Sequence, residues 1–207
     1  MRKNSLDVKI DPMRTAMLVI DMQKCFVEPG AVFCIAGAKK TIPTLVSAIK
    51  HMRNIGVRIV WVTRLYKKDM SDMEFHRRKY LETIGVDGVM FAGSVGKNSI
   101  EDAEGLIRKD DDLSIIKPRF SAFFKTNLDS ILKDSGIDTL ILTGTTTPNC
   151  IRSTAYDGIS YNYRVIIMEN CTSSASAEIQ AANIKDMKRV GVETVQGLDE
   201  FVVITGN

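Results

Sequence analysis

Short runs of β-branched and apolar residues recur along the chain, and turn-forming residues bound each of them. Runs of this kind are typical of strands that are buried on both faces of a parallel sheet. The pattern predicts six strands, at residues 16–20, 57–63, 114–116, 139–143, 164–168 and 193–195.

Segments with helical periodicity separate most of these strands. Residues 44–54, for example, place Leu45 and Ala48 on one helical face. Pro43 is expected in the first turn of this helix, and Gly56 follows its end. Because strand and helix alternate, we expect right-handed βαβ units and an α/β fold in which an open sheet has helices on both faces. The same reasoning predicts further helices at residues 127–133, 150–160 and 177–190.

The long segment at residues 65–112 interrupts this alternation, because a crossover connection needs only about a dozen residues. Its part at 71–83 is polar and compatible with a helix, whereas 85–97 is rich in glycine and has no helical period. We therefore expect a helix and an active-site loop in this segment. The charged run at 109–112 predicts a solvated turn.

The composition indicates one ordinary domain that spans residues 1–207, with 28 basic and 25 acidic side chains. No apolar run approaches the ~18 residues of a membrane-spanning helix. The net charge of +3 is too small to mark a surface for nucleic acid or lipid. We therefore expect neither a membrane nor a nucleic acid as a partner.

The four cysteines lie far apart and form no C-x-x-C pair. The first ten residues also lack the apolar stretch of a secretion signal. Both features predict a cytoplasmic protein, and we expect free thiols at Cys25, Cys34 and Cys171.

Charged and nucleophilic side chains follow four of the predicted strands. Ligands of open α/β sheets bind outside the carboxyl ends of the strands, so these side chains are expected to converge. A helix N-terminus and a nearby ammonium group both lower the pKa of a thiol, which favours an acyl-transfer site. The residues concerned are Asp21, Arg64, Lys117 and, after the turn GTTTPNC, Cys150 at the start of a predicted helix.

Each of these residues also has a purely structural interpretation. An Asp at a strand end often caps a helix or forms a turn, and a Lys in that position is usually solvated. A lone Cys is more often a small buried apolar residue than a nucleophile. Their convergence on one edge of the sheet is what favours chemistry there.

Three segments, VIDMQKCF, IIKPRFSAF and LILTGTTTPNCIRSTAYDG, occur in this order along the chain. Together they resemble the amidohydrolase branch of the isochorismatase-like cysteine hydrolase superfamily. The resemblance runs from about residue 16 through the last predicted helix and is weak over 65–112. It implies a Rossmann-like three-layer fold whose six-stranded sheet is mainly parallel. It also implies a homo-oligomer, a dimer or a tetramer, in which a neighbouring subunit sometimes completes the pocket.

The resemblance implies a catalytic triad at three of the strand-end positions. Cys150 would be the nucleophile, and Asp21 the general base that takes the thiol proton. Lys117 would stabilise the thiolate and orient the carboxylate. The backbone N–H groups of Cys150 and of the preceding turn would then hold the oxyanion of a tetrahedral intermediate.

A cis peptide bond between Thr145 and Thr146 is also implied by the resemblance, and it would aim one of the oxyanion donors. The residues alone favour another bond, between Thr147 and Pro148, because X-Pro bonds adopt the cis form at much lower cost. Both bonds lie in the turn before Cys150.

The presence of Cys150 favours one reaction within the superfamily. Members that cleave the vinyl ether of isochorismate often lack this cysteine, because an enol ether needs an acid and no covalent step. We therefore predict hydrolysis of a C–N bond in a small amide, carbamoyl or ureido substrate through a thioester, with release of ammonia. An enol-ether hydrolase, a nicotinamidase and a non-catalytic binding protein stay open as alternatives.

No metal or other cofactor is predicted. Nicotinamidases of this superfamily hold a metal with an Asp-x-His pair and a further His, whereas this chain has only His51 and His76. Asp72 and His76 are spaced for one helical face, but a surface pair is the simpler interpretation. No G-x-G-x-x-G turn follows the first strand, which excludes a dinucleotide site.

Three residues are candidates for binding substrate. Arg64 is the best anchor for a carboxylate, because its planar fork binds one bidentately, although a solvated arginine is an equal alternative. Phe26 and Phe123 are predicted to form an apolar wall with Phe120, and core packing is the alternative for them.

Overall fold

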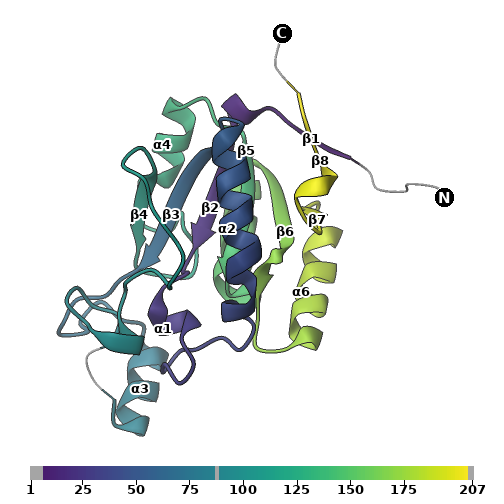
Figure 1. Cartoon of the computed structure of the whole chain (residues 1–207). Helices are drawn as coiled ribbons and strands as arrows, with labels where there is room; N and C mark the ends of the chain where they lie inside the picture. The colour runs from purple at the N-terminus through teal and green to yellow at the C-terminus, as the bar shows by residue number, and fades with distance from the viewer. Residues whose placement is uncertain (1–6, 87–88, 205–207) are drawn as a thin grey trace.

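The computed structural model of the chain describes residues 7–86 and 89–204, and a six-stranded sheet forms its centre (Figure 1). The strand order is β4-β3-β2-β5-β6-β7, and every neighbouring pair is parallel. This confirms the predicted α/β fold. The strands are β2 (Thr15–Ile20), β3 (Arg58–Arg64), β4 (Leu113–Lys117), β5 (Thr139–Thr145), β6 (Arg164–Ser173) and β7 (Glu193–Val195).

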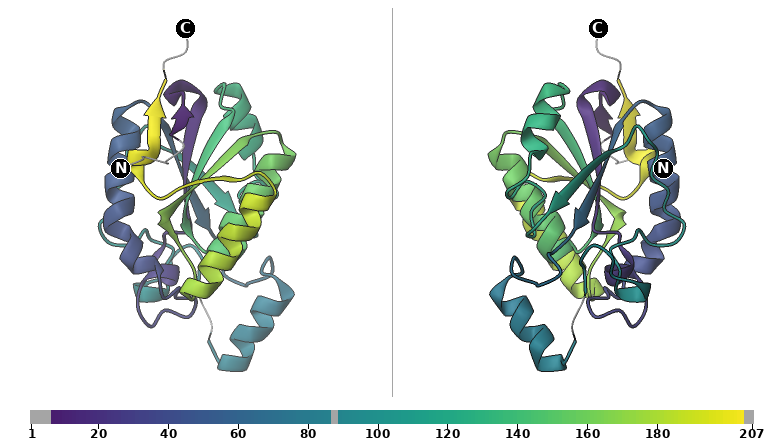
Figure 2. Two further views of the ribbon diagram at one scale, coloured as in Figure 1. Left: turned by 90° about the vertical axis from the view of Figure 1, so that its right-hand side faces the viewer. Right: turned by 90° about the vertical axis from the view of Figure 1, so that its left-hand side faces the viewer.

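Helices cover both faces of the sheet, because successive side chains of a strand point to opposite sides. In β2, Ala16 and Leu18 join the core beneath α4, α5 and α6, whereas Met17 and Val19 join the core beneath α2. Figure 2 shows α2 in blue on one side and α6 in yellow-green on the other. The helices are α2 (Ala38–Asn54), α4 (Leu128–Asp134), α5 (Arg152–Ser160) and α6 (Ala177–Arg189).

The observed α2 begins earlier than predicted, at Ala38, so Pro43 lies inside the helix rather than in its first turn. A proline at this position removes one hydrogen bond of the helix. The apolar face that includes Leu45, Ala48 and Met52 packs against the sheet and stabilises the helix across that gap.

A second, two-stranded sheet was not predicted. It pairs β1 (Val8–Ile10) with β8 (Phe201–Val203) in parallel, so the two ends of the described chain lie side by side (Figure 1). Val8 and Ile10 are buried in the core beneath α2. Strands this short have too little periodicity to predict from sequence.

Residues 65–86 and 89–104 lie beyond the carboxyl ends of β2 and β3, together with α1 (Lys24–Val27), and their helix α3 (Phe75–Ile84) projects from the body (Figure 1). Residues 105–112 run back past α2 to the start of β4. The predicted turn at 109–112 is only partly solvated, because the Asp112 carboxylate accepts hydrogen bonds from Arg53 and from Trp61 Nε1, the latter at 2.8 Å.

Across the described residues, no helix has the length and apolar character that crossing a membrane requires.

Gly144 of β5 lies directly against Ile20 of β2. A Cβ atom added there would lie 2.1 Å from the carbonyl oxygen of Ile20, and the φ of Gly144 is +103°. We expect Gly144→Ala to lower the free energy of unfolding by about 3 kcal/mol or more, since backbone must move to relieve the contact.

Gly191→Ala is the matched control, because Gly191 has a φ of +95° and an added Cβ would meet nothing within 4 Å. This variant should lose only about 1 to 2 kcal/mol, the cost of the backbone conformation. Urea unfolding of both variants measures the difference. Equal losses would show that the contact with Ile20 is unimportant.

Candidate active site

The strand order reverses between β2 and β5, because the chain runs from β2 to β4 on one side and from β5 to β7 on the other. Ligand sites of open α/β sheets lie at such a reversal. Asp21 directly follows β2, and Cys150 lies in the turn that follows β5. The acid and the thiol therefore flank the reversal point.

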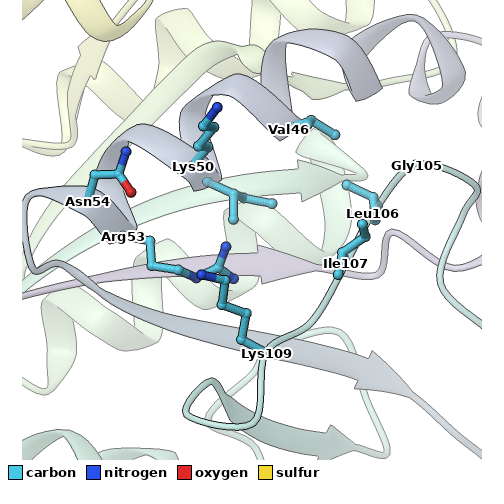
Figure 3. A pocket seen from close by; sticks show the side chains of 9 residues that line it. Val46, Lys50, Arg53, Asn54, Gly105, Leu106, Ile107 and Lys109 are labelled. Atoms are coloured by element: carbon cyan, nitrogen blue, oxygen red, sulfur yellow. The ribbon is translucent and has the colours of Figure 1, made fainter.

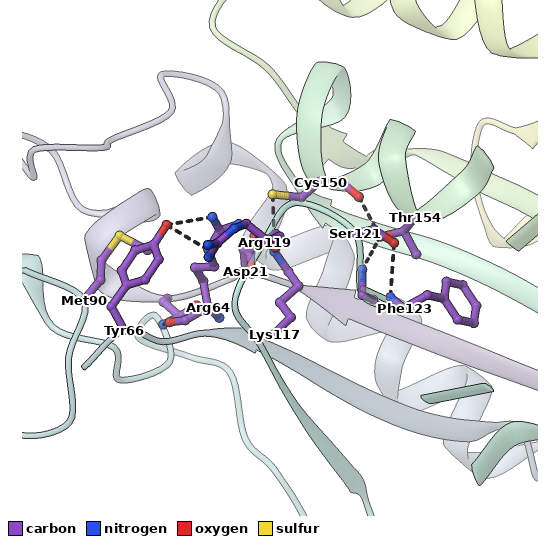
Figure 4. A network of polar contacts seen from close by, with 12 residues as sticks. Asp21, Arg64, Tyr66, Met90, Lys117, Arg119, Ser121, Phe123, Cys150 and Thr154 are labelled. Carbon is purple, nitrogen blue, oxygen red and sulfur yellow. Dashed lines mark hydrogen bonds and ion pairs between the residues drawn. The ribbon is translucent and has the colours of Figure 1, made fainter. Parts of the chain in front are cut away.

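Lys117, the last residue of β4, joins the acid to the thiol (Figure 4). Its Nζ donates to Asp21 Oδ2 at 2.8 Å, to the Arg119 carbonyl at 3.0 Å and to Cys150 Sγ at 3.4 Å. An ammonium group has three donors, and these three contacts use all of them. The structure thus brings together the three residues of the predicted triad, each of them at most 5% exposed.

The backbone and the second oxygen of Asp21 complete its setting. Asp21 has a φ of +53°, and its N–H donates to the Val62 carbonyl at 2.9 Å, which holds the turn after β2 against β3. Its Oδ1 is buried and has no hydrogen-bond partner among the described residues. That oxygen is available to accept a proton.

The pKa of Cys150 is raised to about 11, chiefly because burial disfavours the thiolate and also because the Asp21 carboxylate is close. Lys117 and Arg64 lower this pKa, but their effect is smaller than the combined effect of burial and Asp21. The predicted lowering of the thiol pKa is therefore wrong. At neutral pH the sulfur carries its proton and needs a base before it can attack.

The turn before Cys150 contains a cis peptide bond between Thr145 and Thr146, which confirms that prediction; the alternative bond, Thr147 to Pro148, is not cis. Cys150 lies in a π-helical turn, Thr147–Ile151, rather than at the first position of a regular helix as predicted. The Ile151 N–H donates to the Thr146 carbonyl at 3.3 Å. This hydrogen bond joins residues five apart, which is the spacing of a π-helix.

Ser173, the last residue of β6, holds this turn with three hydrogen bonds. The hydroxyl groups of Thr146 and Thr147 donate to its carbonyl at 3.3 and 3.1 Å, and its own hydroxyl donates to Thr145 Oγ1 at 3.0 Å. Sequence reasoning missed Ser173, because no spacing links the end of β6 to the end of β5. The pairing of Thr145 with Ser173 across the two strands is what brings them together.

Comparison with known proteins identifies the family. The model of the isochorismatase domain matches residues 15–197 of the chain. The chain belongs to the isochorismatase family. This agrees with the resemblance of its three sequence segments and with the fold.

Three relatives illustrate the similarity. The chain is 40% identical over 181 residues to a protein of Arabidopsis thaliana named probable inactive nicotinamidase, covering 87% of this chain and 91% of that one. It is 34% identical to an isochorismatase family protein from Desulfovibrio vulgaris, with a TM-score of 0.82 and coverage of 88% and 93%. It is 27% identical to an isochorismatase-like hydrolase from Alkaliphilus metalliredigens, with a TM-score of 0.75 and coverage of 87% and 93%. The protein is thus an isochorismatase-family hydrolase.

Arg64 of this family member is buried rather than solvated, and two of the three nitrogens of its guanidinium are already paired. Its Nε and Nη2 donate to the Tyr66 hydroxyl at 3.0 and 2.6 Å, and Nη2 also forms an ion pair with Glu74. The Tyr66 hydroxyl in turn donates to Glu74 Oε2 at 2.6 Å. The ring of Phe120 lies 5.4 Å from the guanidinium carbon. Arg64 therefore acts on the site as a fixed charge.

The two phenylalanines predicted to bind substrate have different surroundings. Phe26 lies in a small apolar cluster that includes Tyr66 and Met90, and its ring centroid is 6.4 Å from that of Phe33. Phe123 points away from Cys150 (Figure 4), and its ring stacks on Tyr163 at 5.7 Å. Phe123 therefore belongs to the core beneath α5 and does not line the site, whereas a contact between Phe26 and substrate stays a prediction.

The residues present do not fit the metal site of nicotinamidases. Within 7–86 and 89–204, no three His, Cys, Asp or Glu side chains are grouped so that they could hold a metal ion. Both His51 and His76 are exposed, on α2 and α3. Cys25, Cys34 and Cys171 are free thiols.

A separate cavity of about 300 Å³ lies between α2 and the loop at 105–109 (Figure 3). It contains no residue of the triad. Its wall includes Val46, Ile49, Lys50, Leu106 and Ile107.

Proposed function

We propose that this protein is a metal-independent cysteine hydrolase that cleaves the C–N bond of a small amide, carbamoyl or ureido compound and releases ammonia. The observation that carries the proposal is the buried contact of one ammonium group with both a thiol and a carboxylate, in which Asp21 Oδ1 is left without a partner. These are a nucleophile, its base and a cation for the resulting thiolate.

In the first half of the reaction, Cys150 Sγ attacks the carbonyl carbon as its proton passes to Asp21. Lys117 stays charged and stabilises the sulfur anion as it forms. When the tetrahedral intermediate collapses, the C–N bond breaks and Asp21 returns the proton to the leaving nitrogen. Ammonia departs, and the acyl group is held as a thioester on Cys150.

In the second half, water attacks the thioester carbon while Asp21 takes one of its protons. The C–S bond breaks, the sulfur recovers a proton, and the acid leaves. The raised pKa of Cys150 supports this route, because a protonated thiol needs a neighbouring base in order to react. The same carboxylate serves both halves.

The oxyanion of both tetrahedral intermediates would be held by the backbone N–H groups of Thr146 and Cys150, at the cis turn. Preformed donors of this kind stabilise charge that develops only in the transition state. Their aim depends on the turn, and the turn is held by Ser173.

We expect Ser173→Ala to lower kcat roughly tenfold and to leave KM nearly unchanged, because one bond that aims the turn is lost and no substrate contact is removed. Ser174→Ala is the matched control, since the Ser174 hydroxyl donates to the Ser176 carbonyl, away from the cis turn. Steady-state kinetics of both variants test this. Equal kcat values would show that the Ser173 hydroxyl does not support the turn.

Two alternatives are less well supported. An enol-ether hydrolase has no use for the thiol, which here is held by Lys117. The name of the Arabidopsis relative describes an inactive protein related to nicotinamidases. In this chain Lys117 contacts both Asp21 and Cys150, and the two histidines are exposed. These features favour activity on a substrate other than that of a metal-dependent nicotinamidase.

Ammonia release tests the proposal. The panel contains small amides, carbamoyl amino acids, ureidoacrylate-like compounds and nicotinamide, each assayed with the native protein in the presence and in the absence of a chelator. Release from an acyclic amide or ureido compound that survives the chelator would support the proposal. No release from any compound, or release only without the chelator, would contradict it.

A further inference from the structure

The positively charged side chains around the triad outnumber the carboxylates that are paired with them. Lys117 is paired with Asp21, and Arg64 is paired with Glu74. Arg77, on the first turn of α3, and Arg119, two residues after Lys117, are further half-buried cations. Among the described residues, no carboxylate lies within ion-pair distance of either, and burial of an unpaired charge is costly. Arg119 Nη1 donates to the carbonyls of Asp72 and Pro118, so Arg77 is the one of the two whose guanidinium has no oxygen partner among the described residues.

Arg77 lies on the same side of the site as Arg64, because the ring of Phe120 is close to both. The guanidinium carbon of Arg77 is 6.0 Å from the centre of that ring and 4.5 Å from the centre of the Phe33 ring. The charge of Arg77 also lowers the pKa of Cys25, which Asp21 raises, so this thiol lies within range of both groups. Arg77 therefore lies near Arg64 and Cys25, on the side of the site where Phe120 lies.

The contacts of Arg77 leave its charge uncompensated. Its guanidinium lies over aromatic rings, and Nη1 contacts the sulfur of Met90 at 3.7 Å. A thioether is a weak acceptor and carries no charge. A guanidinium that packs on aromatic rings keeps its N–H groups at the edge, where they can bind a carboxylate bidentately.

We propose that Arg77 binds an anionic group of the substrate, so that the substrate is a small amide that also bears a carboxylate. This inference rests on the proposed function and makes it more specific. It transfers to Arg77 the role that sequence reasoning assigned to Arg64, whose Nε and Nη2 already bind Tyr66 and Glu74. The carboxylate supplies the missing negative charge.

The test compares the monoamides of malonic, succinic and glutaric acid with the corresponding neutral diamides. The three chain lengths cover different separations of carboxylate and amide. Two readouts are taken for each compound: ammonia release, and protection of Cys150 from alkylation by iodoacetamide, measured on its peptide by mass spectrometry. Protection measures binding and does not require turnover.

In the native protein, at least one monoamide should protect Cys150 about tenfold better than its diamide. Arg77→Gln should abolish this preference, so that each monoamide protects Cys150 no better than its diamide. Lys79→Gln, which removes an exposed cation from the same helix, is the control and should retain the preference.

The two proposals fail in different ways. Protection that depends on Arg77, without any ammonia release, would support the anion site and contradict the proposed hydrolysis. Equal protection by monoamides and diamides, no protection by either, or a preference that survives Arg77→Gln would overturn the anion site, whether or not ammonia is released.

Discussion

Replacement of Cys150 by Ala is expected to lower kcat/KM by about 10⁴-fold or more, since no other group can form the thioester and the pathway is lost with the nucleophile. The fold should persist, because the change removes one small buried side chain and no hydrogen bond that joins two strands. Circular dichroism and urea unfolding check the fold, and ammonia release checks the activity.

Cys171→Ala provides the matched control for this experiment. Cys171 is also a buried free thiol, and it lies on β6 in the core beneath α2. Its loss should cost about as much stability, on the order of 1 kcal/mol, and leave kcat within about twofold. If Cys150→Ala kept a substantial part of the activity, the covalent route would be wrong.

Asp21→Asn is expected to lower kcat by about 10³-fold or more, because the amide cannot take the thiol proton or activate water. The Asn side-chain oxygen still accepts a hydrogen bond from Lys117, so we expect a folded protein of reduced stability. Retention of most of the activity would require another base.

The Asp21→Asn variant should also change the pKa of Cys150, in a direction that the structure gives. The Asp21 carboxylate raises the pKa of Cys150, whereas Lys117 and Arg64 lower it. Once the carboxylate is gone, the pKa should fall from about 11 toward that of an ordinary thiol. The thiolate should therefore appear at lower pH in ultraviolet titrations, with Cys150→Ala as the reference. A pKa that rises, or stays the same, would show that Asp21 does not act on the sulfur.

Much of the fold follows from local patterns. The strands of the main sheet each form a separate apolar run, so their presence and parallel pairing can be predicted even where their ends cannot. The positions of Asp21, Lys117 and Cys150 follow from the same reasoning, because each lies at the end of a strand or in the turn after it, and strand ends meet at one edge. Predicting a site at this edge of the sheet therefore requires no knowledge of contacts between distant residues beyond the parallel arrangement of the strands.

Other features depend on contacts that no local pattern encodes. The thiol pKa rises because the folded chain buries the sulfur, and the extent of burial is a property of the folded structure. Arg64 and Glu74 pair across ten residues of irregular chain, which sequence spacing does not indicate. Ser173 and Gly144 matter because of contacts between strands, with the cis turn and with Ile20 respectively.

The central claim is that an acyl group passes through the sulfur of Cys150. Its most direct test is to quench turnover of an active amide with acid within the first catalytic cycles and to measure the masses of the cysteine peptides. We predict a peptide containing Cys150 that carries the added mass of the acyl group and loses it on treatment with hydroxylamine. Steady ammonia release with Cys150 unmodified at every quench time, or with the acyl group on another residue, would contradict this account.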